Sequence, residues 1–118
     1  MRDLAPTITR QRLLVEGYYT IDVDEDVIGR FLDELPDVLG LRTYGRAAVF
    51  APAGLGRQTN EGFDAFVPLI DSGISLYVWT AARFAALVLF TCKAFDSSAA
   101  AGFTRDFFAM TDSEYQQF

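Results

Sequence analysis

The chain contains no histidine among its 118 residues, and it has one cysteine and one lysine. Without an imidazole, a single chain cannot carry serine–histidine or cysteine–histidine catalysis, and histidine metal sites are excluded. A structural zinc site lacks its usual ligands too, so we expect no metal. Any lysine Schiff base would have to use Lys93. Proton transfer must therefore come from carboxylates, tyrosine, water or the thiol of Cys92.

The cysteine count, the lack of long apolar runs and the net charge limit the compartment and the partners that we expect for the protein. A single cysteine permits no internal disulfide, which suits the reducing cytoplasm where we expect the protein. No apolar run reaches the ~18 residues of a membrane span, and the opening MRDLAPTITRQR lacks the apolar centre of a signal peptide. A net charge of −6 argues against nucleic acid as a partner and is compatible with a cationic small-molecule substrate.

Periodicity and turn residues predict an alternation of strands and helices. The first helix follows from acidic residues at its start and from apolar positions Val27, Ile28, Phe31, Leu32 and Leu35. In the second, Asp96 is a candidate cap, and Phe103, Phe107 and Met110 form an expected inward stripe. We expect strands at 12–20, 41–50, 63–70, 74–79 and 83–92, helices at 22–40 and 97–110, a loop at 51–62, and a polar tail without an element at 111–118.

This order predicts one domain over residues 1–118 with an α+β fold. Successive antiparallel strands would form the sheet, and both helices would cover one face, giving a two-layer sandwich. The nearly continuous apolar run at 83–92 favours a central strand, whereas Pro68 indicates an edge or a bulge. Alternation along 74–79 sets Ile74, Leu76 and Val78 against Ser75, Tyr77 and Trp79.

Several residues are candidates for chemistry, and each has a structural alternative. Asp-Ser-Gly at 71–73 is turn chemistry in the first place, and Cys92 at the end of an apolar strand can be a small inert hydrophobe. Tyr77 and Trp79 share one strand face and can serve packing alone. Glu16 lies among apolar and aromatic neighbours, so it is either solvent-facing or held inward with a partner.

Taken together, these segments resemble the S-adenosylmethionine decarboxylases, particularly the short bacterial kind. That family shows a Glu-Ser-His segment, then a strand that ends in tryptophan, then a strand that ends in Phe-Thr-Cys. Here Asp-Ser stands at 71–72, Trp79 follows, and Phe-Thr-Cys stands at 90–92. Upstream, LLVEGYY at 13–19 is similar to the family's first strand, and VFAPAG at 49–54 to its Phe-x-Pro-x-Gly segment.

The resemblance implies a cofactor made by the backbone itself. In the family the serine attacks the preceding carbonyl, and the chain breaks to leave a pyruvoyl group that serves as an electron sink for decarboxylation. Carried over, Ser72 would become the pyruvoyl group and Asp71 the new C-terminus. Cys92 would protonate the substrate carbanion, Phe50 would stack on adenine, and Glu16 would lie near the cationic substrate.

Four departures from the family bear on self-cleavage or on the substrate. The family's histidine after the serine is Gly73 here, and the histidine that helps elimination is Tyr77. The Pro-Glu after the tryptophan is Thr80-Ala81, and the processing serine of the family has no clear counterpart, with Thr59 nearby. A tyrosine with an ordinary pKa of ~10 is a poor base for the serine α-proton at neutral pH.

Three functions follow from these observations. The first is a divergent enzyme, a lyase by its resemblance, that has lost self-cleavage and needs no cofactor. It would use an aromatic pocket with Tyr77, Trp79, Cys92 and Glu16 for elimination, cyclisation or isomerisation of a small organic substrate. The second is a pyruvoyl-dependent decarboxylase of S-adenosylmethionine or another amino acid, and the third is a non-catalytic binding partner. We expect a homodimer, because aromatic side chains on an open sheet face favour a partner.

Overall fold

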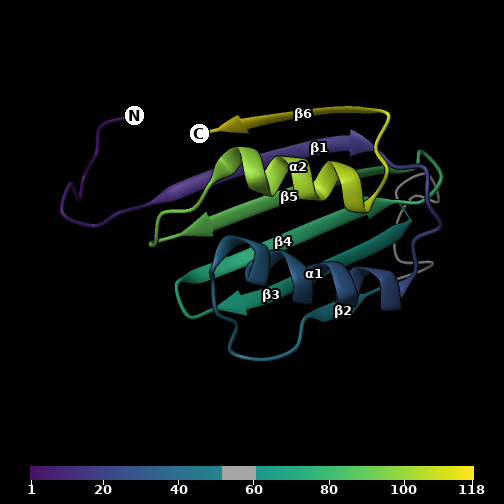
Figure 1. Cartoon of the computed structure of the whole chain (residues 1–118), viewed down its shortest axis with the longest axis horizontal. Helices are drawn as coiled ribbons and strands as arrows, with labels where there is room; N and C mark the ends of the chain where they lie inside the picture. The colour runs from purple at the N-terminus through teal and green to yellow at the C-terminus, as the bar shows by residue number, and fades with distance from the viewer. Residues whose placement is uncertain (52–60) are drawn as a thin grey trace.

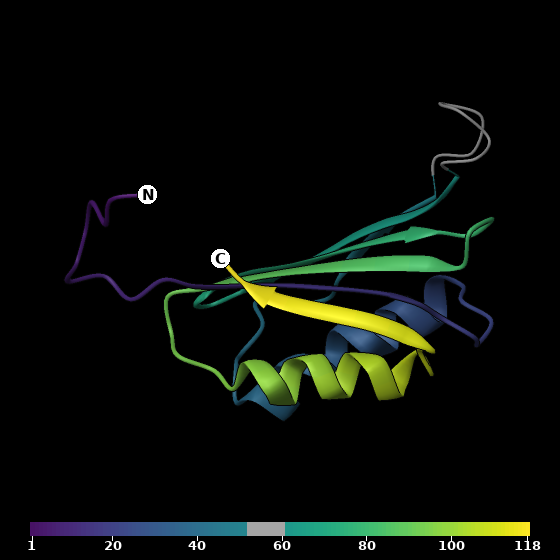
Figure 2. The same ribbon diagram turned by 90° about the horizontal axis from the view of Figure 1, so that it is seen from above.

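The computed structural model describes residues 1–51 and 61–118, in which six strands and two helices form two layers. Both helices lie on the same side of the sheet, as the two views in Figures 1 and 2 show. The predicted α+β two-layer sandwich is thereby confirmed. The elements in chain order are β1 (Gln11–Tyr18), α1 (Glu25–Leu39), β2 (Ala48–Phe50), β3 (Gly62–Leu69), β4 (Ser72–Trp79), β5 (Phe84–Thr91), α2 (Ser97–Phe107) and β6 (Asp112–Gln117).

The sheet is antiparallel throughout, with the strand order β2, β3, β4, β5, β1, β6. As expected for its apolar run, β5 is an inner strand, between β4 and β1. Alternate residues of the inner strands are buried beneath the helices, among them Leu13, Val15, Ile74, Leu76, Leu87 and Leu89. The alternation predicted for 74–79 is confirmed, since Ser75, Tyr77 and Trp79 are not buried. No helix in the described ranges is long and apolar enough to cross a membrane.

Helix α1 begins where the carboxylate of Asp24 accepts a hydrogen bond from the backbone N–H of Val27 at 2.9 Å. This cap replaces one of the helix's missing backbone acceptors. The helix ends at Gly40, whose φ of 68° is a conformation that glycine adopts without steric cost. Phe31 is fully buried at its centre and holds the helix against the core.

Helix α2 is capped in the expected way, but its inward stripe differs from the prediction. The Asp96 carboxylate accepts from the backbone N–H of Ala99 at 3.0 Å, and this hydrogen bond lowers the pKa of Asp96. Phe103, Phe107 and Met110 are only partly buried. The fully packed positions are small residues and the aromatic that follows the helix, namely Ala100, Ala101, Thr104 and Phe108. Small side chains let α2 approach the sheet closely, so the larger rings pack sideways, where they contact Phe31 of α1.

Two sequence predictions about strands are wrong. Only Ala48–Phe50 of the segment 41–50 forms a ladder, and the earlier part makes one isolated bridge, between Thr43 and Leu69. The tail expected to lack an element forms β6, which pairs with β1 along its length. Pro68 is tolerated in β3 because the ladder with β2 extends only from Asp64 to Phe66.

Candidate functional site

The peptide bond between Asp71 and Ser72 lies in the tight turn that joins β3 to β4. Leu69 and Ser72 face each other across the hairpin, so only Ile70 and Asp71 form the turn. Ser72 has a φ of 137°, a backbone conformation that glycine favours and that strains a residue with a side chain. Strain of this kind costs roughly 1–3 kcal/mol and tends to persist at functional sites, which makes this residue a candidate.

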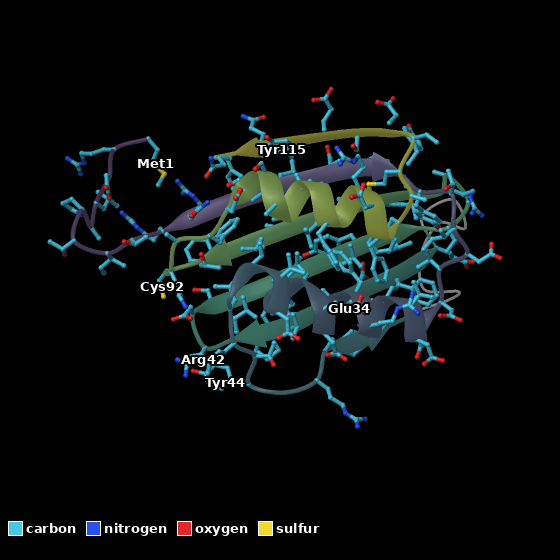
Figure 3. The ribbon with its side chains drawn as sticks, viewed as in Figure 1. Met1, Glu34, Arg42, Tyr44, Cys92 and Tyr115 are labelled. Carbon is cyan, nitrogen blue, oxygen red and sulfur yellow. The ribbon has the colours of Figure 1, made fainter. Side chains whose placement is uncertain are left out.

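Cys92 lies directly against this turn, at the end of the sheet where β5 finishes (Figure 3). Its backbone N–H donates to the carbonyl oxygen of Asp71 at 2.8 Å, and its thiol lies 3.4 Å from the same oxygen. Two donors on one carbonyl stabilise the negative charge that an attack on its carbon would create. Cys92 is exposed, so it is not the buried inert thiol that the apolar strand allowed as an alternative.

The two side chains directly opposite Ser72 on the neighbouring strands are not bases. Directly opposite Ser72 on the neighbouring strands stand Leu69 and Thr91, and the Thr91 hydroxyl donates to the backbone carbonyl of Lys93. Neither a leucine nor a threonine accepts a proton near neutral pH. Two donors therefore contact the Asp71 carbonyl oxygen, and no side chain directly opposite Ser72 accepts a proton near neutral pH.

Gly73, which follows Ser72 directly, lies against an aromatic ring. A Cβ placed on Gly73 would lie 2.6 Å from Cε2 of Phe66, far inside normal contact distance. Phe66 belongs to the adjacent strand β3 and lies on the same sheet face. A larger side chain at position 73 would fit only if this ring moved, so glycine and Phe66 form a matched pair.

A second group of candidates forms one row across the face of the sheet that no helix covers. The strand register aligns one residue from each of the six strands, and residues directly opposite in antiparallel pairs point to the same side. In the order of the strands, the row is Phe50, Asp64, Tyr77, Ala86, Glu16 and Glu114. Three carboxylates and two aromatic rings thus share one line, which we call the open-face row.

The members of the open-face row differ in exposure. Phe50 is 61% exposed and Tyr77 38% exposed, whereas Glu16 is half-buried. Glu16 points away from the core. Of the two placements predicted for it, solvent-facing or held inward with a partner, the structure shows the solvent-facing one. Glu16 and Glu114 line a small cavity of about 110 Å³ at the edge formed by β1 and β6. The row therefore offers carboxylates beside aromatic surface, a combination that suits an organic cation.

Trp79 lies on the open face two positions beyond Tyr77, within an aromatic cluster. Its ring centroid is 5.5 Å from that of Phe84, and Tyr18 contacts Phe84 from the other side at 5.2 Å. Aromatic pairs at these separations add to strand pairing. Trp79 is half-buried in this cluster, so part of its indole surface is open to a ligand.

The structure thus divides the predicted site residues between two places. Ser72, Asp71 and Cys92 meet at one end of the sheet. Tyr77 lies five positions further along β4, about 17 Å away at the usual rise of a strand. Glu16 shares the open-face row with Tyr77 rather than with Cys92. Pro52 to Gly54 of the segment 49–54, and Thr59, lie outside the described residues.

Sequence reasoning missed Asp64 and Glu114 as members of the row. The charge at Asp64 within an otherwise apolar strand was a usable signal, because a charged residue there must face solvent. Glu114 gave no such signal, since the polar tail does not show the alternation of a half-buried strand. Within the described part of the chain, no three acidic, cysteine or histidine side chains are grouped closely enough to hold a metal ion.

Tyr19 lies buried directly after β1, close to Arg83. Burial raises the pKa of its hydroxyl above the ordinary value of 10.0, and the nearby Arg83 opposes this change. The Arg83 guanidinium lies 5.2 Å from the centre of the Tyr19 ring. Tyr19 is buried in the core and serves packing.

Comparison with known proteins agrees with this architecture. The profile of the S-adenosylmethionine decarboxylase family matches residues 11–118. The crystal structure of the adenosylmethionine decarboxylase from Aquifex aeolicus superposes with a TM-score of 0.70. It is 18% identical in sequence, and the match covers 94% of this chain and 89% of that one. No curated protein matches the sequence significantly. Since the profile extends over nearly the whole chain, the protein belongs to the S-adenosylmethionine decarboxylase family.

Proposed function

We propose that the chain binds a small organic cation of the S-adenosylmethionine class on the open face of its sheet and transforms it without cleaving itself. The observation that carries the proposal is the open-face row, in which the carboxylates of Asp64, Glu16 and Glu114 share one line with aromatic residues. Carboxylates attract a sulfonium or ammonium group, and ring faces bind it further by cation–π contact. The net charge of −6 favours the approach of such a ligand.

The residues of the row have distinct roles in this proposal. Phe50 and Trp79 offer ring faces for the purine or another flat group. Glu16 pairs with the cation or accepts a proton, and Tyr77 donates or relays one. Proton transfer between such groups supports an elimination, a cyclisation or an isomerisation, and none of these reactions requires an added cofactor. Family membership supports the substrate class.

Retention of an intact chain is the second part of the proposal, and the surroundings of Ser72 support it. Formation of a pyruvoyl group requires a base for the serine α-proton. The side chains opposite Ser72 are Leu69 and Thr91, and Tyr77 lies further along β4 on the other face of the sheet. At position 73, where the resemblance sets a family histidine, the Phe66 ring leaves no room for a side chain unless it moves.

A pyruvoyl-dependent decarboxylase is the second candidate, favoured by the contacts of the Asp71 carbonyl. Cys92 places two donors on the oxygen of the bond that would break, and the backbone at Ser72 is strained. In that case Ser72 would be the source of the pyruvoyl group, which supplies an electron sink for decarboxylation. Asp71 would remain at the C-terminus of the first fragment, and the Cys92 thiol would hold a proton beside the reacting centre.

We further propose that the protein works as a homodimer in the cytoplasm. Exposed rings gather on the open face, and a second copy laid over it would remove them from water; they are Tyr18, Phe50, Phe66, Tyr77 and Phe90. The single free thiol of Cys92 suits a reducing compartment.

A ligand-binding experiment tests the proposed site. Titration of the full chain with S-adenosylmethionine should raise the melting temperature, since a ligand at 100 times its Kd stabilises by about 2.7 kcal/mol. Glu16→Gln should weaken binding about 10-fold or more, because a hydrogen bond to a charged group is worth about 1.5–3 kcal/mol. Glu34→Gln, on the exposed face of α1, is the matched control.

Two further variants separate catalysis from binding alone. Tyr77→Phe and Cys92→Ala remove the proton-carrying groups of the two places described above. Loss of turnover in Tyr77→Phe with retained binding supports acid–base chemistry on the open face. Unchanged turnover in Tyr77→Phe and unchanged affinity in Glu16→Gln together contradict the proposed site. Binding with no turnover of any product would favour the non-catalytic alternative.

A further inference from the structure

A separate cavity at the start of β1 is lined by arginines, although the chain as a whole is acidic. It has a volume of about 650 Å³ and lies between the N-terminal segment and the end of the sheet. Figures 1 and 2 show this segment folding back toward the end of β6. Among the side chains of its lining, Arg2, Arg10 and Arg12 are positively charged and Asp3 is negatively charged. This local excess of positive charge contrasts with the net charge of −6.

Arg10 holds the cavity in shape and is already neutralised. Its guanidinium forms an ion pair with Asp3 and donates to the backbone carbonyl of Ala5 at 3.1 Å. It also donates to the carbonyl of Ile8 at 3.3 Å. These contacts tie the N-terminal segment to the start of β1. The charge of Asp3 is therefore committed to Arg10, which leaves the charges of Arg2 and Arg12 without a carboxylate partner among the described residues.

Arg12 has a polar group that lacks a partner. Its Nε is buried and makes no hydrogen bond, and its guanidinium carbon lies 5.6 Å from the centre of the Phe118 ring. The ring stays in place because the backbone N–H of Phe118 donates to the carbonyl of Arg12 at 3.3 Å. The two terminal nitrogens of the guanidinium, rather than this buried Nε, are the donors that a ligand in the cavity can reach.

We infer that this cavity binds an organic carboxylate, with the planar guanidinium of Arg12 as its main partner. A guanidinium presents parallel N–H donors that match the two oxygens of a carboxylate. Pro6, Ile8 and Phe118 supply apolar wall, which suits an organic group attached to the carboxylate better than a small, fully hydrated anion. Arg2 adds a second positive charge at the rim. This site goes beyond the proposed function and uses none of the open-face row.

Calorimetric titration of the full chain with a matched pair of probes tests the inference. The carboxylate probe is 4-phenylbutyrate, and its uncharged counterpart is 4-phenylbutyramide, which keeps the apolar part. We expect 4-phenylbutyrate to bind and the amide to bind at least about 10-fold more weakly, because the charged hydrogen bonds to Arg12 are lost. Inorganic phosphate is a third probe, expected to bind more weakly than the organic carboxylate.

Substitutions identify the residue responsible. Arg12→Gln should weaken 4-phenylbutyrate binding about 10- to 100-fold. Arg12→Lys keeps the aliphatic stem and the charge but loses the fork, so it should fold normally and bind with an affinity between those of the parent and Arg12→Gln. Arg46→Gln, at an exposed position beside α1 and away from this cavity, is the control and should leave affinity unchanged.

Three results would overturn the inference. The first is equal affinity for the carboxylate and the amide, which would make the cavity a general apolar site. The second is phosphate binding as tight as that of 4-phenylbutyrate, which would indicate unspecific anion attraction. The third is parent-like affinity in both Arg12 variants. Should Arg12→Gln fail to fold, the comparison of Arg12→Lys with Arg46→Gln still decides.

Discussion

The two carboxylates at the edge of the open-face row should work against the stability of the free protein. Glu16 and Glu114 face each other directly across β1 and β6, which places their Cβ atoms about 4.5–5.5 Å apart. Like charges in this position destabilise a sheet by up to about 1 kcal/mol. Glu16→Gln or Glu114→Gln keeps the shape of the side chain and removes the repulsion. Each single variant should therefore be more stable than the parent chain.

The expected gain can be converted into a melting temperature. Unfolding entropy is about 2.1 cal/mol/K per residue, so for this chain a change of 1 kcal/mol shifts Tm by about 4 °C. Each single variant should thus melt up to about 4 °C higher in differential scanning calorimetry at neutral pH and low salt. Raising the salt concentration should shrink the difference, because exposed charges are screened over about 10 Å at 0.1 M.

A double variant and a control make the test specific to this pair. Glu16→Gln combined with Glu114→Gln should be scarcely more stable than either single variant, since one substitution already removes the repulsion. Glu34→Gln on the exposed face of α1 should leave Tm nearly unchanged. The reasoning is refuted if the single variants melt no higher than the parent, or if their effects add fully in the double variant.

Three further outcomes are expected. Gly73→Ala should lower the free energy of unfolding by about 1–3 kcal/mol in urea denaturation, because its Cβ would overlap the Phe66 ring. Phe66→Ala in the same chain should reduce that loss. If the losses of the two single variants simply add in the double variant, the contact is contradicted. Phe31→Ala should cost about 3–5 kcal/mol, since this ring is fully buried among other aromatic rings; a loss below 1 kcal/mol by the same assay would contradict its place in the core. Asp96→Asn should be less stable than the parent above pH 3.8, the ordinary pKa of this group. The difference in stability should disappear as the pH falls through the lowered pKa of Asp96, because the parent carboxylate is then protonated. A difference that persists in acid unfolding curves would rule out the charged cap.

The elements with an apolar rhythm could be predicted from the sequence. The run at 83–92 and the alternation at 74–79 both indicate strands whose inward residues form the core, and the structure has them there. The helix at Glu25–Leu39 follows equally from its apolar stripe and its acidic start. In each case a single segment contains the information, because the side chains that it buries repeat at the period of the element.

Elements held by backbone pairing rather than by burial could not be predicted in this way. Strand β6 buries almost no side chain and exists because it continues the sheet along the free edge of β1. The segment 41–50 has strand-forming residues, yet Tyr44 and Gly45 lie in a connection where only Thr43 makes a bridge. Propensity alone does not show which of two such segments finds a partner.

The candidate site was predictable only strand by strand. Alternation places Tyr77 on one face of β4, but it does not reveal which residue of β1 stands level with it. That alignment depends on the pairing of β4 with β5 and of β5 with β1, which bring Tyr77 and Glu16 into one row. Ser72 lies at the other end of β4 and on the other face of the sheet, so residues expected in one pocket occupy two places.

The mass of the intact purified chain tests the central claim most directly. Electrospray mass spectrometry under denaturing conditions, on protein purified without added amines, distinguishes the two chemical states of Ser72. The account predicts one species with the mass of the uncleaved sequence and an unmodified serine at position 72. Two fragments separated between Asp71 and Ser72, with the second blocked by a pyruvoyl group, would contradict it and establish the pyruvoyl-dependent alternative.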